Sequence, residues 1–96
     1  MSGQIFEYIR NRKSGKVGVI VGMVIDKRVL IGWSKCNVEL DKFDTKEGLK
    51  IAVDRAMGTL IPSNIAPPCL HSQIRRFSSR CCRYFKGANQ ILLPID

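Results

Sequence analysis

Cationic side chains dominate residues 71–86, HSQIRRFSSRCCRYFK, a stretch without an acidic residue. The cations are Arg75, Arg76, Arg80, Arg83 and Lys86. On a helix, Arg76, Arg80 and Arg83 share one face, and no carboxylate within the stretch can pair with them. Because arginine binds phosphate through two parallel hydrogen bonds, this face predicts phosphate binding. The alternatives are a solvated face, or pairing with acidic residues elsewhere, namely Glu39, Asp41 and Asp54.

A second basic cluster surrounds Ser14-Gly15 near the start of the sequence. Its members are Arg10, Arg12, Lys13 and Lys16. A glycine between cations suits a flexible loop that grips phosphate, and an exposed turn without a ligand is the alternative. The segment is not a nucleotide-binding P-loop, because the spacing of glycines and lysine that the motif requires is absent.

The most distinctive local sequence is IGWSKCN, residues 31–37. Trp33, at the end of an expected strand, can stack on a nucleobase. The polar side chains that can donate hydrogen bonds beyond it are Ser34, Lys35 and Asn37. The alternative interpretation places Trp33 in the core as its largest anchor and Asn37 in a turn.

Thiols and the single histidine raise the question of a zinc site. The candidate ligands are Cys69, His71, Cys81 and Cys82. Zinc sites are typically built from C-x-x-C or H-x-x-x-H pairs, and neither occurs here, so we expect no metal or other cofactor. With one histidine, no carboxylate pair of recognisable spacing and no nucleophile motif, we also expect no enzymatic activity.

Charge and length limit what such residues can belong to. The chain has 96 residues and a formal net charge of +8, which predicts a polyanionic partner such as nucleotide, nucleic acid or an acidic protein. The excess lies in residues 1–40 and 71–96, whereas residues 41–70 are neutral. Ordinary globular proportions, with 45% hydrophobic and 25% charged residues, predict one domain over residues 1–96.

A β-hairpin is expected to form the centre of the fold, with strands at about 17–25 and 28–34. Both faces of the first strand are apolar, which is typical of a central strand covered on both sides. Val17, Val19 and Val21 are expected on one face, with Ile20 and Val24 on the other. Residues 4–9 form either an edge strand or a short helix, and the tail, residues 90–95, forms an edge strand.

Two helices complete the predicted α+β fold, a small antiparallel sheet packed against both. The first spans about residues 45–57, with Asp44 as N-cap and an apolar residue at every third or fourth position. The second spans about residues 72–86 and ends at Gly87. Its apolar stripe, opposite the arginine face, consists of Leu70, Ile74, Phe77, Cys81 and Phe85.

The cysteines are expected to be reduced thiols in the cytoplasm. Cys36, Cys69, Cys81 and Cys82 lack the spacing of a disulfide framework. No apolar run is long enough for a signal peptide or a membrane span, so we expect no membrane partner.

One block of the sequence resembles small uncharacterised proteins of tailed bacteriophages. The matching segments are VGV at 17–19, IGWSKCN at 31–37, DKF at 41–43, GLKIA at 48–52 and RA at 55–56. The resemblance implies a phage origin and action inside an infected bacterium, and it brings no known activity with it. Small phage proteins of this kind often bind a host factor or an immune signal, including cyclic nucleotides used in bacterial defence.

These observations predict non-catalytic binding of a phosphate-bearing ligand. The first hypothesis is a phage counter-defence protein that sequesters a nucleotide immune signal. The second is a nucleic-acid-binding regulator that uses the same cations on an open surface, and the third is a basic inhibitor of an acidic host protein. A ligand enclosed between copies would stabilise so small a core, so we expect a homo-oligomer.

Overall fold

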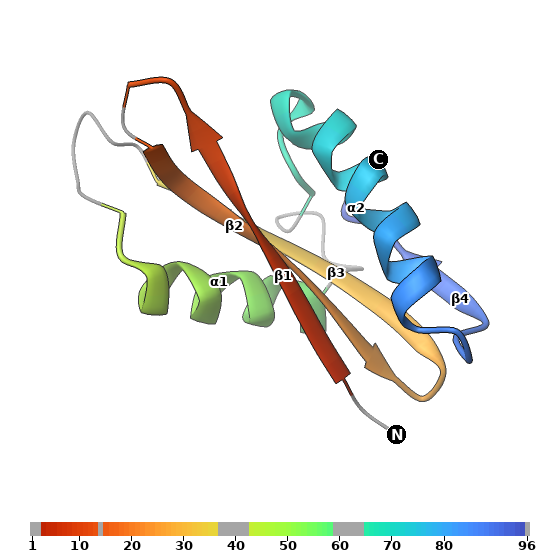
Figure 1. Cartoon of the computed structure of the whole chain (residues 1–96). Coiled ribbons are helices and arrows are strands. Elements are labelled where there is room, and N and C mark those ends of the chain that lie inside the picture. Colours follow the sequence, from red (N-terminus) through yellow and green to blue (C-terminus); the bar gives the residue numbers. More distant parts are fainter. Residues whose placement is uncertain (1–2, 14, 37–42, 59–64, 96) are drawn as a thin grey trace.

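The computed structural model describes residues 3–13, 15–36, 43–58 and 65–95. Within these residues, four strands and two helices follow one another, with the 3-10 turn η2 ahead of the second helix (Figure 1). Their bounds are β1 Gly3–Asn11, β2 Gly15–Ile25, β3 Arg28–Lys35, α1 Thr45–Met57, the 3-10 turn Pro68–Leu70, α2 His71–Tyr84 and β4 Gln90–Leu92. None of the described helices is long and apolar enough to cross a bilayer.

The strands form one sheet in the order β1-β2-β3-β4. β2 pairs antiparallel with β1 on one side and with β3 on the other, which confirms the predicted α+β fold and its central hairpin. Residues 4–9 are part of an edge strand rather than a helix. The expectation of a purely antiparallel sheet is wrong at one edge, because β4 pairs in parallel with β3. The long connection through both helices returns the chain to the same end of the sheet, as parallel pairing requires.

The two helices cover opposite faces of the sheet (Figure 1). α1 packs on β2 and β3, where Gly32 of β3 leaves room for Ala52 and Ala56. α2 packs on the other face, where Gly22 of β2 faces Cys81 and Phe77. β2 is therefore a central strand buried on both sides, as its sequence predicts.

Val17 lies on the face opposite to the one expected. It belongs to the core cluster under α2 with Ile20, whereas Val19 and Val21 lie under α1. The cause is a bulge: Ile9 pairs with Gly18 and Arg10 with Lys16, so Val17 is the extra residue. An extra residue reverses the alternation of side chains in a strand.

The helices match their predicted ranges closely. α1 has the expected bounds, and its N-cap Asp44 accepts hydrogen bonds from the backbone N–H groups of Lys46 and Glu47 at 2.9 and 3.1 Å. α2 ends at Tyr84, two residues before the expected end, because the backbone of Phe85 leaves the helix at ψ 74°. This turn buries the Phe85 ring beside Gly3 of β1.

Candidate anion-binding surface

The helix α2 lies beside β1, the edge strand of the sheet. Gln73 of α2 donates hydrogen bonds from Nε2 to the Tyr8 carbonyl oxygen and to Glu7 Oε2, both at 3.3 Å. Further along α2, Arg80 Nη1 lies 3.9 Å from Oε1, the other carboxylate oxygen of Glu7. These contacts fix the polar flank of α2 along the outer edge of β1.

The predicted arginine stripe faces away from the core. The apolar residues expected on the inner side of α2 are all buried, whereas Arg76, Arg80 and Arg83 are exposed, as are Arg75 and Lys86. Their spacing of four and three residues aligns the stripe along α2. The pairing expected as an alternative falls instead on Glu7, since Asp54 lies on α1 across the sheet, and Glu39 and Asp41 lie outside the described residues.

The bond between Arg80 and Glu7 is weak. Their side chains are 50% and 37% exposed, and the closest nitrogen–oxygen distance is 3.9 Å. Exposed pairs of this kind stabilise a protein by about 1 kcal/mol or less. Arg80 can therefore exchange Glu7 for a phosphate at little energetic cost.

The second basic cluster lies at the turn between β1 and β2. Arg10, Arg12, Lys13 and Lys16 are all exposed there. Lys16 Nζ lies 4.2 Å from the centre of the Tyr8 ring, a cation–π contact that holds this lysine over β1. The cluster thus continues the line of β1 beyond its C-terminal end.

An exposed aromatic side chain lies on the α1 side of β1, opposite the α2 side on which Glu7 contacts Arg80. Phe6 of β1 is 43% exposed, and its ring meets that of Tyr8 edge to face, with centroids 5.5 Å apart. We did not single out Phe6 from the sequence. The signal is the alternation in the segment IFEYI, which places Phe6 and Tyr8 on one side and Glu7 on the other once the segment is a strand.

The backbone of β1 directs hydrogen-bonding groups outward between these side chains. The Val17 carbonyl oxygen accepts a hydrogen bond from the Cys36 N–H. Because hydrogen-bonded positions alternate along a strand, the backbone groups of Val19 bond to β3. Tyr8, which pairs with Val19, therefore directs its own backbone N–H and carbonyl away from β2. The hydrogen bond from Gln73 Nε2 to the Tyr8 carbonyl oxygen is consistent with this outward direction. By the same alternation, the backbone groups of Gln4 and Phe6 face outward.

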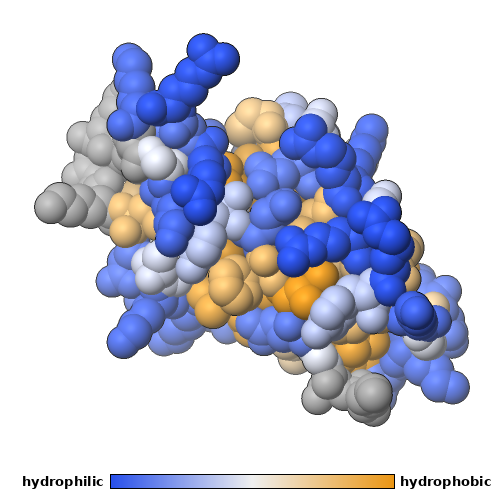
Figure 2. Space-filling model, viewed as in Figure 1, coloured by the Kyte–Doolittle hydropathy of each residue, from blue (hydrophilic) through white to orange (hydrophobic). Residues whose placement is uncertain are grey.

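Viewed onto the β1 edge, these features form one surface (Figure 2). Hydrophilic side chains gather at the β1–β2 turn and along α2, with an apolar area between them over β1. We call this surface the β1 face, made of the Phe6–Tyr8 pair, the turn cations and the arginine stripe of α2. Two sequence-predicted clusters, about 60 residues apart in the chain, therefore border the same strand.

The residues of IGWSKCN are not brought onto the β1 face. The Arg55 guanidinium lies over the Trp33 ring, 4.0 Å from its centre, and Arg55 Nη1 donates to the Trp33 carbonyl oxygen at 3.1 Å. This partial burial lowers the pKa of Arg55. Ser34 is buried, Lys35 contacts Cys69, and Asn37 lies outside the described residues. The arrangement favours the structural role of Trp33.

The candidate zinc ligands serve other contacts. His71 Nε2 lies 3.0 Å from the Ala66 carbonyl oxygen, and Lys35 Nζ lies 3.7 Å from Cys69 Sγ. Burial raises the pKa of Cys81 to about 12, so this thiol stays protonated. Within the described parts of the chain, no three potential ligands gather as a metal site would require.

No protein-family model, curated protein or solved structure matches this chain. The resemblance to tailed-phage proteins therefore stays a prediction. The β1 face is the feature from which a function can be argued.

Proposed function

We propose that this protein is a non-catalytic binder of phosphate-bearing ligands, and that the β1 face binds single-stranded nucleic acid. The supporting observation is the alignment of two exposed cationic clusters along one strand, with an exposed aromatic side chain on the α1 side of the same strand. Proteins that bind single strands combine a cationic track for phosphates with aromatic rings for bases. The β1 face offers both.

The length of the β1 face favours a polymer over a single nucleotide. β1 has nine residues, or about 30 Å at 3.3 Å per residue, and cations lie at its end and beside it. A mononucleotide concentrates its phosphates at one point, whereas a strand repeats them along its length. The exposed edge strand also suits splayed bases better than a duplex.

In this proposal the arginine stripe neutralises consecutive phosphates, and Arg80 leaves Glu7 for the ligand. The turn cations bind the backbone at the other end of the strand. Phe6 supplies a stacking surface for a base. The outward N–H groups of Gln4 and Phe6 donate hydrogen bonds to base edges, and their carbonyl oxygens accept hydrogen bonds from them. The phosphate and stacking contacts do not depend on the identity of the bases.

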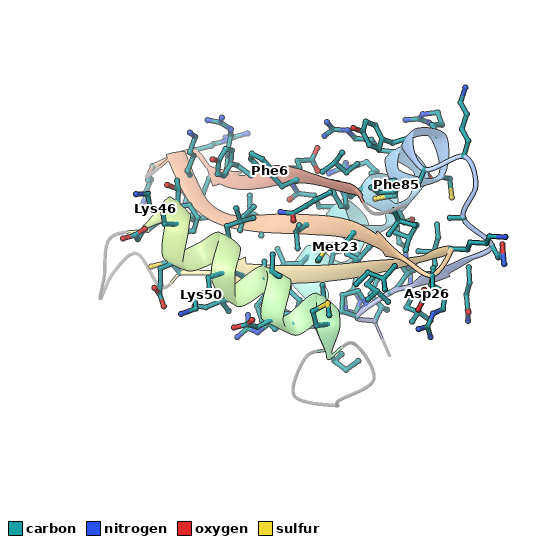
Figure 3. The ribbon with its side chains drawn as sticks, turned by 90° about the horizontal axis from the view of Figure 1, so that it is seen from below. Phe6, Met23, Asp26, Lys46, Lys50 and Phe85 are labelled. Atoms are coloured by element: carbon teal, nitrogen blue, oxygen red, sulfur yellow. The ribbon has the colours of Figure 1, made fainter. Side chains whose placement is uncertain are left out.

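A binding measurement with a matched pair of variants tests the proposal. Arg76→Glu/Arg80→Glu changes two exposed cations four residues apart on α2, and Lys46→Glu/Lys50→Glu does the same on α1, across the sheet. Figure 3 shows Lys46 and Lys50 along α1, the helix that covers the sheet face opposite α2 and its arginine stripe. Each pair lowers the net charge from +8 to +4.

Fluorescence anisotropy with labelled oligothymidylate and oligouridylate at low salt provides the measurement. We expect the α2 pair to weaken binding about 100-fold and the α1 pair less than about threefold. Equal losses in both variants would mean that only net charge matters. That result, or an absence of binding to either probe at low salt, would overturn the proposal.

Nucleotide sequestration is the second candidate, and a hollow at the end of α2, lined by Lys27, Tyr84 and Phe85 among others, favours it. A counter-defence role inside an infected bacterium rests on the phage resemblance alone. The homo-oligomer also stays a prediction, and the mass in solution from light scattering, with and without oligothymidylate, tests it. If the β1 face is a docking surface for an acidic protein instead, neither oligonucleotide binds it.

A further inference from the structure

A hollow lies at the end of the molecule where α2 stops and where β2 turns into β3. Its lining consists of Gly3, Val24, Asp26, Lys27, Tyr84, Phe85, Lys86, Gly87 and Ala88. Figure 3 shows Asp26, at the β2–β3 turn, and Phe85, after α2, at this same end. Tyr84, one of the lining residues, follows Arg83 of the arginine stripe in the chain.

Two aromatic rings give the hollow a floor and a wall. Phe85 is mostly buried, and Tyr84 is 62% exposed. Their planes are 87° apart, with centroids separated by 4.9 Å. Gly3 keeps the floor open, because a Cβ there would lie 3.0 Å from the Phe85 ring. A flat apolar group can lie on one ring while its edge contacts the other.

Charged groups line the rim. Lys27 and Lys86 are both exposed cations, and Asp26 supplies the one carboxylate among the lining residues. An anion at the rim would meet two ammonium groups, and a hydroxyl or amino group would find an acceptor in Asp26. A planar apolar body joined to a phosphate and to hydrogen-bond donors describes a nucleotide.

The β2–β3 turn holds Lys27 in an unusual backbone conformation. Asp26 and Lys27 have φ values of 52° and 63°, in the left-handed region that favours glycine or asparagine. The Lys27 carbonyl accepts a hydrogen bond of 2.7 Å from the Asn89 N–H, which joins the turn to the segment after α2. A two-residue hairpin turn requires positive φ at both of its central positions, so the pairing of β2 with β3 keeps the Lys27 backbone in this conformation.

We propose that this hollow binds a nucleoside phosphate unit, with the base against Tyr84 and Phe85 and the phosphate between Lys27 and Lys86. Asp26 accepts a hydrogen bond from a ribose hydroxyl or a base amino group. This inference deepens the proposed function, on which it rests for the class of ligand. The unit comes either from a free nucleotide or from the end of a strand that lies on the β1 face.

Calorimetric titration with AMP, adenosine and inorganic phosphate tests the site. We expect AMP to bind about tenfold or more tightly than either fragment, because base and phosphate contact separate parts of the hollow. Tyr84→Ala removes the exposed ring, and Lys27→Gly removes a cation. Each is expected to weaken AMP binding about tenfold.

Lys27→Gly also separates binding from folding. Glycine adopts a positive φ without strain, so this variant should unfold at a higher urea concentration than the unchanged protein. Weaker AMP binding in a more stable protein cannot come from partial unfolding. AMP binding that is undetectable at millimolar concentration, or unchanged in both variants, would overturn the inference.

Two further arms identify the source of the nucleotide and keep the two proposals distinguishable. If the site takes a strand end, a 5′-phosphate on oligothymidylate strengthens binding, and Lys27→Gly removes that gain. If it takes a free nucleotide, AMP binds and the 5′-phosphate adds nothing. Arg76→Glu/Arg80→Glu should leave AMP binding within about threefold, so loss of oligothymidylate binding alone refutes only the proposal for the β1 face.

Discussion

Arg80 of α2 lies 3.9 Å from Glu7 of the edge strand β1. This pair joins the helix that carries the arginine stripe to the strand that carries Phe6. The same carboxylate accepts a hydrogen bond from Gln73, so Glu7 organises the flank of α2 while it repels phosphates from the β1 face. Glu7 therefore favours ligand binding by holding α2 in place and disfavours it by repelling phosphates.

Glu7→Gln should strengthen binding of oligothymidylate. The amide keeps an oxygen that can accept from Gln73, removes the repulsion of phosphates and frees Arg80. Because the exposed pair contributes about 1 kcal/mol or less, we expect a gain of about two- to fivefold and little change in stability. Anisotropy and urea unfolding measure the two quantities.

Glu47→Gln is the matched control, since Glu47 is exposed in the first turn of α1 and the substitution changes the net charge equally. It should leave the affinity almost unchanged. An equal gain in both variants would mean that Glu7 acts only through net charge. Weaker binding by Glu7→Gln would contradict the assigned role of Arg80.

Gly22→Ala should destabilise the fold. A Cβ at this position would lie 2.6 Å from Cys81 Sγ and 3.1 Å from the Phe77 ring, so α2 would have to move away from β2. Overpacking of this kind costs about 1–3 kcal/mol, measurable as a lower free energy of unfolding in urea. Gly87→Ala is the control, because a Cβ there meets nothing within 4 Å. Equal stability in both variants would contradict the close packing at Gly22.

The buried thiol of Cys81 predicts a loss of stability at alkaline pH. Burial raises its pKa from 9.0 to about 12, so above pH 9 the unfolded chain releases a proton that the folded protein retains. Ionisation therefore stabilises the unfolded state, by about 1.4 kcal/mol at about pH 10. Urea unfolding of Cys81→Ala should lack this component, whereas Cys82→Ala, at an exposed position, should retain it. Identical pH profiles in the two variants would show that Cys81 ionises freely.

Arg55→Ala should change the environment of the single tryptophan. The substitution removes the guanidinium from the Trp33 ring and the hydrogen bond to the Trp33 carbonyl oxygen. We expect a red shift of Trp33 fluorescence and a loss of about 1 kcal/mol in stability. The control is Lys50→Ala, an exposed position on the same helix.

The same fluorescence tests the base-stacking hypothesis for Trp33. Because Arg55 covers the ring, oligothymidylate should bind without quenching Trp33 in the unchanged protein. Strong quenching in the unchanged protein, together with a loss of affinity in Trp33→Phe, would restore Trp33 as a binding residue and shift the site away from the β1 face.

Most local elements could be predicted from the sequence, and the errors have identifiable causes. The Asp44 cap and the apolar spacing of α1 define its bounds, and the apolar stripe of α2 identifies its buried side. Val17 was misplaced because a bulge depends on pairing with Ile9 and Gly18. The end of α2 was misplaced because burial of Phe85 beside Gly3 competes with continuation of the helix.

Only the cationic part of the candidate site can be predicted from the sequence. Both cationic clusters follow from residue type and spacing. Phe6 does not, because its exposure depends on β1 being an edge strand that α1 leaves uncovered. The hollow beside Tyr84 is formed by three segments distant in sequence, so no local sequence pattern predicts it.

By itself, the sequence determined the net charge of +8, the faces of the two helices and the hairpin at the centre of the sheet. These depend on residues that are near neighbours along the chain, where the periods of helix and strand apply. The tertiary structure alone decided that the arginine stripe and the turn cations border the same strand. That juxtaposition arises because α2 packs on β2 at Gly22 and contacts Glu7 of β1, and packing between distant segments is set by shape and volume rather than by local period.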